Sequence, residues 1–291
     1  MKAMVLAAGL GTRLRPYSLL RPKPLFPVLG QPLILRIIGQ LRSAGFGPII
    51  VNAFHLADQL MAILADQPDI ILQRELIELG TGGGLRMARN HFDNEPVLIT
   101  NADIYHDIDY EAVMVRHGQN RCPITMVMQD HPRFNKVAVR NGQVLGFANG
   151  PLTVESGAAA HRLAFTGIHV VDPIVLDDIP LSCFYSIIDR YQEHLQTGGM
   201  IKAMTVTGHF WQDIGTLNDY LGLHQFLLND HLPSFMLGEN VDIGQGVKLE
   251  DWGYIGDRVI IGDGASLARV VVWDGAVIAP GSSLTDCLVT A

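Results

Sequence analysis

A glycine-containing turn near the start of the chain leads directly into a cluster of cations. Apolar residues at positions 4–8 predict a short buried strand, and Gly9 and Gly11 follow it. Glycine lets backbone amides point at an anion without obstruction by a side chain. The cations that come next are Arg13, Arg15, Arg21 and Lys23. We interpret this segment as a binding site for the phosphates of a nucleotide.

The distribution of charge favours a local anion site over a nucleic-acid surface. The chain has a net charge of -8, yet residues 1–57 contain seven Lys or Arg and no Asp or Glu. A nucleic-acid-binding domain is expected to be basic overall, whereas here only one segment is basic. We therefore expect no nucleic acid among the partners.

Two well-known glycine loops do not fit this segment. The Walker loop requires Gly, four residues and then Gly-Lys-Ser or Gly-Lys-Thr, and the chain contains no such string. The dinucleotide fingerprint would need a third glycine where Leu14 stands, and a carboxylate about twenty residues later, where there is none.

The pattern Gly-Leu-Gly-Thr-Arg-Leu-Arg-Pro at residues 9–16, followed by Pro-Lys-Pro at 22–24, resembles the signature of sugar-1-phosphate nucleotidylyltransferases. Further motifs of that family follow in the same order: Leu79-Gly80-Thr81-Gly82-Gly83-Gly84, Asn101-Ala102-Asp103, Phe165-Thr166-Gly167-Ile168 and Trp211-Gln212-Asp213-Ile214-Gly215-Thr216. The resemblance covers about residues 1–230. By motif, the chain is most similar to mannose-1-phosphate guanylyltransferases and N-acetylmuramate-1-phosphate uridylyltransferases.

The resemblance implies an enzyme that joins a nucleoside triphosphate and a sugar-1-phosphate to give an NDP-sugar and pyrophosphate. The attacking phosphate oxygen is already ionised near neutral pH, so the enzyme has to supply positioning and charge neutralisation rather than a strong base. Arg13 is the candidate for stabilising charge on the α-phosphoryl group, because its guanidinium is planar and always charged. Lys23 lies between two prolines, which restrict its backbone, and it is expected to contact phosphate.

The same resemblance assigns Asp103 and Asp213 to a metal site. Mg2+ typically binds one or two carboxylates and takes its other ligands from water and phosphate. Asp103 is also counted among the catalytic residues. For Asp103 alone, a structural aspartate in a turn is the alternative.

Substrate-binding residues are implied on both sides of the reaction. The nucleotide-binding candidates are Ala8, Gly9, Gly11, Thr12, Gly80, Thr81 and Gly83. The glycine run at 79–84 is expected to be a loop that reads the base, with a flexible linker as the alternative. The sugar-binding candidates are Lys136, Thr166 and Gly167. Many relatives carry Glu-Lys-Pro where this chain has residues 147–152, so its sugar contacts depart from the family pattern.

The first two thirds of the chain alternate short apolar runs with amphipathic stretches, as βαβ units do. The fold class we expect is α/β, a Rossmann-like, mixed but mostly parallel sheet. Strands are predicted at 3–8, 48–53, 69–73, 96–100 and 123–128, and helices from Pro32, at 184–196 and at 216–229. Asn141-Gly142 predicts a hairpin turn, and 149–161 a loop or lid. Because ligands bind at the carboxyl ends of parallel strands, the glycine turn and Asp103 are expected at one edge.

A six-residue period appears after residue 231, with apolar residues at 243, 249, 255, 261, 267 and 273 and a one-residue slip before 278 and 284. Hexapeptide repeats stack parallel strands into a solenoid, so we expect a short left-handed parallel β-helix. An antiparallel sandwich is the alternative. The predicted domains are residues 1–232 and 233–291, and the second is expected to support a homo-oligomer.

Other residue types add little to the function. Three widely spaced cysteines and the absence of a membrane-length apolar run predict reduced thiols, no membrane partner and a cytoplasmic location. Asp107 and Asp109 are interpreted as turn and capping residues. His117 and His194 are expected on helix surfaces, and no histidine enters the mechanism.

Three other functions were weighed against sugar nucleotide synthesis. Acyl transfer by a hexapeptide solenoid normally needs a histidine base, and none follows His231. A non-catalytic sensor of nucleotide sugars would be expected to lack Arg13, Lys23, Asp103 or Asp213, and all four are present. Cytidylyl transfer to an alcohol phosphate such as phosphocholine stays open as the alternative.

Overall fold

The computed structural model describes residues 1–147, 160–229 and 234–291, and contacts group the chain into two compact units. The first unit comprises Met1–Leu10 and Ile37–Trp211, and the second Gly11–Arg36 and Gln212–Ala291. The predicted boundary at 232/233 and residues 149–159 of the predicted lid lie outside the described residues. The contacts thus group most of residues 9–23, which are predicted to bind phosphate and are called the phosphate-binding segment below, with the C-terminal part of the chain.

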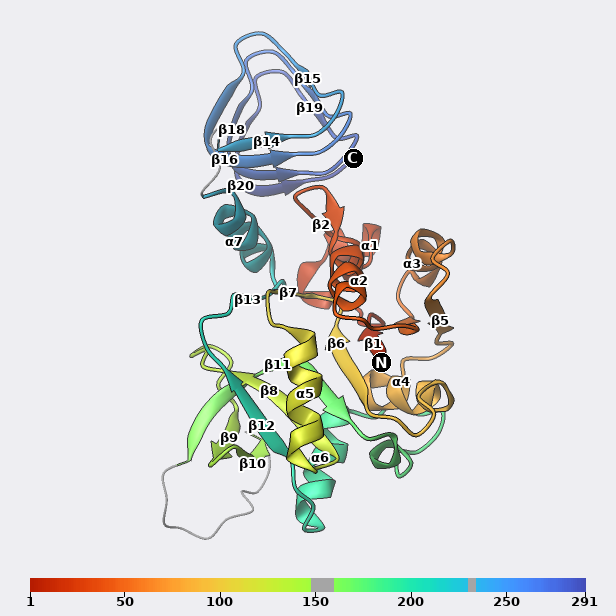
Figure 1. Cartoon of the computed structure of the whole chain (residues 1–291). Coiled ribbons are helices and arrows are strands. Elements are labelled where there is room, and N and C mark those ends of the chain that lie inside the picture. Colours follow the sequence, from red (N-terminus) through yellow and green to blue (C-terminus); the bar gives the residue numbers. More distant parts are fainter. Residues whose placement is uncertain (148–159, 230–233) are drawn as a thin grey trace. The chain divides into compact units, whose positions relative to one another are not determined.

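The first unit contains, among the described residues, a nine-stranded sheet in the order β5-β4-β1-β6-β11-β8-β12-β10-β9 (Figure 1). Its strands are β1 (Lys2–Leu6), β4 (Ile49–Ala53), β5 (Ile70–Arg74), β6 (Val97–Asn101), β8 (Ile124–Gln129), β9 (Val137–Arg140), β10 (Gln143–Phe147), β11 (His161–Val171) and β12 (Lys202–Val206). All five predicted strands are confirmed as strands of this sheet.

The sheet is mixed, and its parallel part is smaller than expected. Strands β5, β4, β1 and β6 are parallel, but β11 runs antiparallel to both β6 and β8. The predicted hairpin β9–β10 is confirmed, with Asn141 and Gly142 at φ 51° and 69°. Because this hairpin precedes β11, the chain re-enters the sheet in the opposite direction, which a repeated βαβ pattern did not anticipate.

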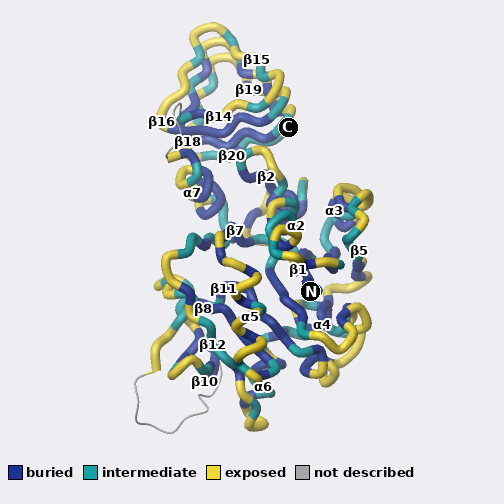
Figure 2. The backbone as a smooth tube through the Cα atoms, in the orientation of Figure 1, coloured by how far each residue is buried: buried dark blue, intermediate teal, exposed yellow. Residues whose placement is uncertain are grey.

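Helices cover both faces of this sheet. They are α2 (Leu33–Ser43), which begins in the second unit, α3 (Ala57–Leu64), α4 (Gly80–Ala88), α5 (Tyr110–Asn120) and α6 (Ile187–Gln196). Ile99 of β6 packs in one core cluster with Leu85 of α4 and Tyr191 of α6. The next residue, Thr100, points to the other face and accepts a hydrogen bond from Tyr110 of α5 at 3.2 Å. Figure 2 shows the central strands buried along most of their length.

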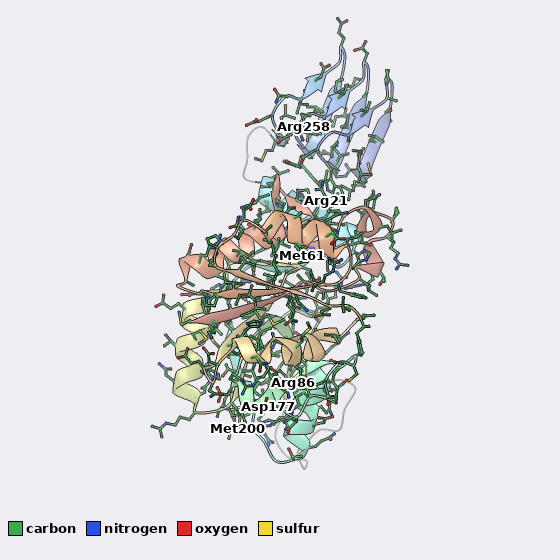
Figure 3. The ribbon with its side chains drawn as sticks, turned by 90° about the vertical axis from the view of Figure 1, so that its right-hand side faces the viewer. Arg21, Met61, Arg86, Asp177, Met200 and Arg258 are labelled. Atoms are coloured by element: carbon green, nitrogen blue, oxygen red, sulfur yellow. The ribbon has the colours of Figure 1, made fainter. Side chains whose placement is uncertain are left out.

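Surface ion pairs connect the C-terminal end of α4 with the residue that follows the short helix η4 (Pro173–Leu176). Arg86 and Asp177, both labelled in Figure 3, approach to 3.0 Å, and Arg89 reaches the same carboxylate at 3.1 Å. Partly exposed pairs of this kind contribute little free energy each. Among the described residues, no helix is both long and apolar enough to cross a membrane.

The prediction for His117 was wrong, because this residue is buried rather than on a helix surface. Its Nδ1 lies 3.0 Å from Thr125 Oγ1 and its Nε2 3.2 Å from Asp172 Oδ1. His117 therefore lies on the inner face of α5 and takes part in a hydrogen-bond network. The helical period of the sequence alone would place this polar residue in solvent. His194 is half-buried, and Asp109 caps α5 as predicted.

The second unit contains two sets of parallel strands. One set is β14 (Phe235–Leu237), β16 (Lys248–Ile255), β18 (Ser266–Val272) and β20 (Ser283–Val289), and the other is β15 (Asp242–Ile243), β17 (Ile260–Ile261) and β19 (Val277–Ile278). We call these strands the C-terminal stack. Ser266 pairs with Lys248, 18 residues earlier, and with Ser283, 17 residues later. The predicted slip of one residue is therefore present, and the antiparallel alternative is wrong.

The rest of the second unit packs around this stack. Helix α7 (Leu217–Leu228) contacts β16, β18 and β20, and Thr216 caps it by accepting a hydrogen bond from the Asp219 amide at 3.2 Å. The early segment contributes η1 (Thr12–Leu14), α1 (Tyr17–Leu20), η2 (Lys23–Leu25), β2 (Pro27–Val28) and β3 (Gln31–Pro32). The predicted helices near 184–196 and 216–229 are both confirmed.

His169 is a buried polar side chain without a hydrogen bond in the described part of the first unit, and the hydroxyl of the neighbouring Tyr191 is another such group. His169 on β11 is 1% exposed, and neither ring nitrogen has a hydrogen-bond partner there. Its ring contacts the rings of Phe165 and Tyr191. Burial lowers the pKa of His169 from 6.5 to about 3.

We predict that His169→Leu stabilises the protein and flattens its acid sensitivity. Leucine removes two buried ring nitrogens without partners, so the free energy of unfolding should rise by about 1 kcal/mol or more at pH 7. Because the folded-state pKa is depressed, the unfolded chain takes up the proton first, and stability present above pH 6.5 is lost as the pH falls toward 3. Urea unfolding at pH 7 and pH 5 measures both effects. A variant with unchanged pH dependence would contradict this account.

Candidate active site

The phosphate-binding segment is a series of tight turns. Gly11 adopts the left-handed conformation with φ 60°, and its carbonyl accepts a hydrogen bond from the Leu14 amide at 2.9 Å. Arg13 lies in η1 with its side chain 60% exposed, whereas Lys23 begins η2 and is only 6% exposed. The two prolines around Lys23 are buried with it. The local sequence thus presents one exposed cation and withdraws another from water.

Three of the predicted site residues meet within the second unit. Lys23 Nζ lies 3.3 Å from Asp213 Oδ1, and Arg13 Nη2 lies 3.7 Å from Asp213 Oδ2. Gly215 makes room for this arrangement, since a Cβ there would lie 2.7 Å from Arg13 Nη1. One carboxylate therefore faces two cations, which gives the group both the positive charge that phosphates need and a hard oxygen ligand.

Aromatic side chains that we did not single out for the site anchor this segment to the C-terminal stack. The ring of Phe26 lies edge-on to Tyr220 and Trp273, with centroid distances of 5.5 and 4.9 Å. Tyr220 donates a hydrogen bond to the Pro27 carbonyl and accepts one from Trp273 Nε1 at 3.2 Å. Arg21, labelled in Figure 3, has its guanidinium 4.5 Å from the Trp273 ring centroid. The stack therefore supports the backbone that carries Lys23.

The first unit places Ala8, Gly9 and Asp103 at one edge of its sheet, whereas Gly11 and Thr12 belong to the second unit. Strands β1, β4, β5 and β6 are parallel, so their carboxyl ends lie together. Ala8 and Gly9 follow β1, and the half-buried Asp103 lies in the turn between β6 and β7 (Ile104–His106). Leu6 pairs with Asn101, and the Leu6 carbonyl accepts a hydrogen bond from the Ala102 amide at 3.0 Å. Asp103 therefore follows directly after the strand that neighbours β1.

The predicted sugar-binding residues have different surroundings. Gly167 adopts φ 79°, and a Cβ there would lie 2.7 Å from Asn101 Nδ2, so this turn packs tightly against the Asn-Ala-Asp motif. Thr166 is buried, and its hydroxyl donates to the Val127 carbonyl at 2.9 Å. Lys136 is exposed just before β9. Thr166 thus has a structural role in the sheet, and the sugar contacts of all three residues stay predictions.

The glycine run at 80–84 is a helix and not the expected loop. Residues Gly80–Ala88 form α4, and the Gly82 and Gly83 amides both donate to the Tyr185 carbonyl, at 2.8 and 3.2 Å. Thr81 Oγ1 accepts a hydrogen bond from the Ile187 amide at 3.0 Å. The missing side chains let the helix approach this neighbouring backbone, which is a packing reason for glycine. The predicted base contacts of Gly80, Thr81 and Gly83 stay predictions.

A buried carboxyl group that sequence reasoning missed lies at the same edge of the sheet. Glu75 follows β5, is 4% exposed and accepts a hydrogen bond from Asn52 Nδ2 at 2.7 Å. Burial raises the pKa of Glu75, while the hydrogen bonds from Asn52 and the Leu79 amide act in the opposite direction. The position of Glu75 directly after a predicted parallel strand indicates a site residue by the same reasoning as for Asp103, but we applied that reasoning only to Asp103.

The sequence as a whole matches one known family. A family model described as nucleotidyl transferase matches residues 2–230, which span the glycine turn, both aspartate motifs and the whole nine-stranded sheet. The chain belongs to the nucleotidyl transferase family. This result confirms the family that the motifs resemble.

Similar proteins agree with this assignment along the length of the chain. A UTP-glucose-1-phosphate uridylyltransferase from Synechocystis sp. is 27% identical over 341 residues, covering 99% of this chain and 87% of that protein. Mannose-1-phosphate guanylyltransferase 1 from Arabidopsis thaliana is 28% identical over 306 residues, covering 99% and 81%. The solved structure of HddC from Yersinia pseudotuberculosis complexed with GMP-PN is similar in fold, with a TM-score of 0.64, 23% identity and coverage of 78% and 99%.

Gly9 differs from the other motif glycines because the protein itself leaves space there. A Cβ built on Gly9 meets no heavy atom of the described residues within 4 Å, and its φ is not positive. Packing therefore does not explain why this residue lacks a side chain. The family motif that contains Gly9 points to close approach of a bound ligand to the backbone there.

We predict that Gly9→Ala leaves the protein as stable as the wild type but weakens nucleotide binding at least about tenfold, because the new methyl group occupies space that the phosphates need. Thermal unfolding and a titration with a nucleoside triphosphate in the presence of Mg2+ measure the two effects. Gly118→Ala is the matched control, since this exposed glycine in α5 also has open space around it. Unchanged nucleotide affinity in Gly9→Ala would show that Gly9 does not face the ligand.

Proposed function

We propose that this protein transfers a guanylyl group from GTP to the phosphate of a sugar-1-phosphate, with mannose-1-phosphate as the first candidate acceptor. In this reaction a phosphate oxygen of the sugar phosphate attacks the α-phosphorus of the triphosphate. The bond from that phosphorus to the β-phosphate bridging oxygen breaks, and pyrophosphate leaves with the electron pair. No proton has to be removed from the attacking oxygen, so fixed charges and alignment supply the rate enhancement.

The observation that carries this proposal is the buried Lys23, held with Arg13 at the carboxylate of Asp213. A lysine withdrawn from water attracts a phosphate more strongly than an exposed lysine does, because less solvent screens it. The Arg13 side chain is 60% exposed, its ion pair with Asp213 is long, at 3.7 Å, and its planar fork suits two phosphate oxygens at once. We assign Lys23 to triphosphate binding and Arg13 to the charge that develops on the α-phosphoryl group and pyrophosphate.

The acidic residues fit a magnesium ion that arrives with the nucleotide. Among the described residues, no group of three or more His, Cys, Asp or Glu side chains could form a metal cage. Mg2+ does not need one, because it uses one or two carboxylates and completes its shell with phosphate and water. Asp103 and Asp213 are the carboxylates that would hold it, and when bound it would neutralise charge on the triphosphate.

The choice of guanine rests on the similar proteins. The Arabidopsis relative is a guanylyltransferase, and HddC was solved with GMP-PN. The Synechocystis relative is a uridylyltransferase, so UTP with glucose-1-phosphate is the second candidate pair. The glycine helix α4 and the residues after β1 are the elements we assign to nucleotide binding.

We also propose that the C-terminal stack is a left-handed parallel β-helix of hexapeptide repeats. The 18-residue step between paired strands equals three hexapeptides, and Ile255, Ile261 and Leu267 are buried inside it. Ile243 and Leu249, at the start of the same period, are exposed. In the proposed enzyme this β-helix supports the phosphate-binding segment through Trp273, and it is also the candidate surface for a homo-oligomer.

The experiment that tests the proposal is a grid of ATP, CTP, GTP, UTP and dTTP against mannose-1-phosphate, glucose-1-phosphate and phosphocholine, with pyrophosphate release as the measurement. We expect turnover with GTP and mannose-1-phosphate in Mg2+, and its loss when the metal is chelated. Turnover only with CTP and phosphocholine would replace the proposal by the cytidylyltransferase alternative. A folded protein that releases no pyrophosphate in any combination would be a sensor rather than an enzyme.

We predict that Arg13→Ala and Asp103→Asn each lower turnover at least about a hundredfold, because each removes charge that stabilises the transition state. Steady-state rates at saturating substrates measure this effect, and circular dichroism checks that the fold survives. Arg116→Ala and Asp107→Asn are the controls, since Arg116 is exposed on α5 and Asp107 lies between β7 and α5, with its Oδ1 2.9 Å from His209 Nδ1. Near-normal turnover in Arg13→Ala or Asp103→Asn would show that its assigned role is wrong.

A further inference from the structure

We propose that Glu75 is a positioning residue that sets the direction of a buried hydrogen-bond chain and thereby holds two nucleotide-binding segments in place. The chain runs from the Ala7 amide through Asn52 to Glu75 and on to the Leu79 amide. This inference rests on the proposed function, because the segments it holds are those assigned to the nucleotide.

The chain consists of three hydrogen bonds within the first unit. The Ala7 amide donates to Asn52 Oδ1 at 2.8 Å, and Asn52 Nδ2 donates to Glu75 Oε1 at 2.7 Å. The Leu79 amide donates to Glu75 Oε2 at 3.4 Å. Asn52 is 2% exposed and Glu75 4%, so water does not compete for these groups.

The polarity of this chain follows from its two ends. A backbone amide can only donate, so the amides of Ala7 and Leu79 both require an acceptor. An asparagine side chain has one acceptor end and one donor end. An ionised carboxyl group only accepts, and Glu75 therefore turns the amide group of Asn52 so that its carbonyl oxygen faces Ala7.

The surrounding packing is adapted to this pair. A Cβ on Gly84 would lie 2.8 Å from both Asn52 Nδ2 and Glu75 Oε1, so the glycine lets α4 pass directly over them. A buried carboxyl group is a weak source of stability, because removing it from water costs free energy that its hydrogen bonds have to offset. We therefore assign Glu75 a role in orienting its hydrogen-bond partners, Asn52 and the Leu79 amide.

Both ends of the chain lie next to predicted nucleotide contacts. Ala7 directly precedes Ala8 and Gly9 in the glycine turn, and Leu79 directly precedes Gly80 at the start of α4. If the hydrogen bonds of Glu75 were lost, the glycine turn after Ala7 and the start of α4 after Leu79 could both shift. The effect is therefore expected on nucleotide binding and not on binding of the sugar phosphate.

The test reverses the polarity of the pair with substitutions that keep the number of heavy atoms. Glu75→Gln alone brings one donor against another donor, and Asn52→Asp alone brings two carboxyl groups together. In the double variant Asn52→Asp/Glu75→Gln, Asp accepts from Ala7 and from the Gln amide, and the Gln oxygen accepts from Leu79. Every donor again meets an acceptor, and the net charge equals that of the wild type.

The measurements are KM for GTP, KM for mannose-1-phosphate and the dissociation constant of GTP by calorimetry, with UTP and glucose-1-phosphate as second probes. We expect each single variant to raise KM and the dissociation constant for the nucleotide about tenfold and to leave KM for the sugar phosphate within about twofold, as one mismatched buried hydrogen bond predicts. The double variant should return both nucleotide constants to within about threefold of the wild type.

Thr125→Val is the matched control for a purely structural effect. It removes a buried hydroxyl that lies 3.0 Å from His117 Nδ1. Thr125 is in β8, which is separated from β4, the strand of Asn52, by three other strands of the sheet. This variant should lower the melting temperature while leaving both KM values unchanged.

The outcomes separate the inference from the proposed function. Single variants with wild-type affinity for GTP and UTP, or a double variant no better than the weaker single variant, would overturn the positioning role of Glu75. A wild-type protein that neither binds nor uses either nucleotide would overturn the proposed function, and the inference with it.

Discussion

A lysine ammonium group withdrawn from water has to find a partner, and for Lys23 that partner is Asp213, 190 residues later in the chain. An isolated buried charge costs several kcal/mol, so the early segment and the residues that follow Trp211 must meet accurately. Neighbouring residues of the second unit allow the contact between Lys23 and Asp213. Gly215 leaves space beside the carboxylate, and Thr216 caps α7 immediately afterwards. Trp273 and Tyr220 then hold the backbone that follows Lys23.

This arrangement gives the C-terminal stack a part in forming the site. The C-terminal stack is a small set of short strands, so packing against other elements adds to its stability. Here the packing is mutual, since the stack buries Phe26 and α7 while it supports the turns that carry Lys23. A substitution deep in the stack is therefore expected to be transmitted to the phosphate-binding segment through direct contacts.

The sequence was sufficient for those features that depend on local chemistry. Buried parallel strands, the Asn-Gly hairpin and the Asp109 cap each follow from a few neighbouring residues. The direction of β11 was not predictable, because it depends on where the chain re-enters the sheet after the hairpin.

Features that depend on contacts between distant residues were missed in the same way. His117 of α5 points into the protein, because Thr125 and Asp172 are its hydrogen-bond partners there. The spacing of polar residues within α5 does not reveal those partners. Asn52 and Glu75 are 23 residues apart, and each on its own reads as an ordinary polar residue after an apolar strand. Lys23 and Asp213 were found despite their separation only because each lies in a motif of the family.

The motif glycines show why a sequence pattern and a ligand contact are different findings. At Gly83 a side chain would collide with the Cys183 carbonyl oxygen at 2.7 Å, and at Gly84 with two buried polar side chains at 2.8 Å, so the fold alone requires glycine. At Gly9 the described residues impose no such requirement. All three belong to family motifs, and the sequence treats them alike. A motif glycine therefore points to a ligand only where the packing of the protein does not already account for it.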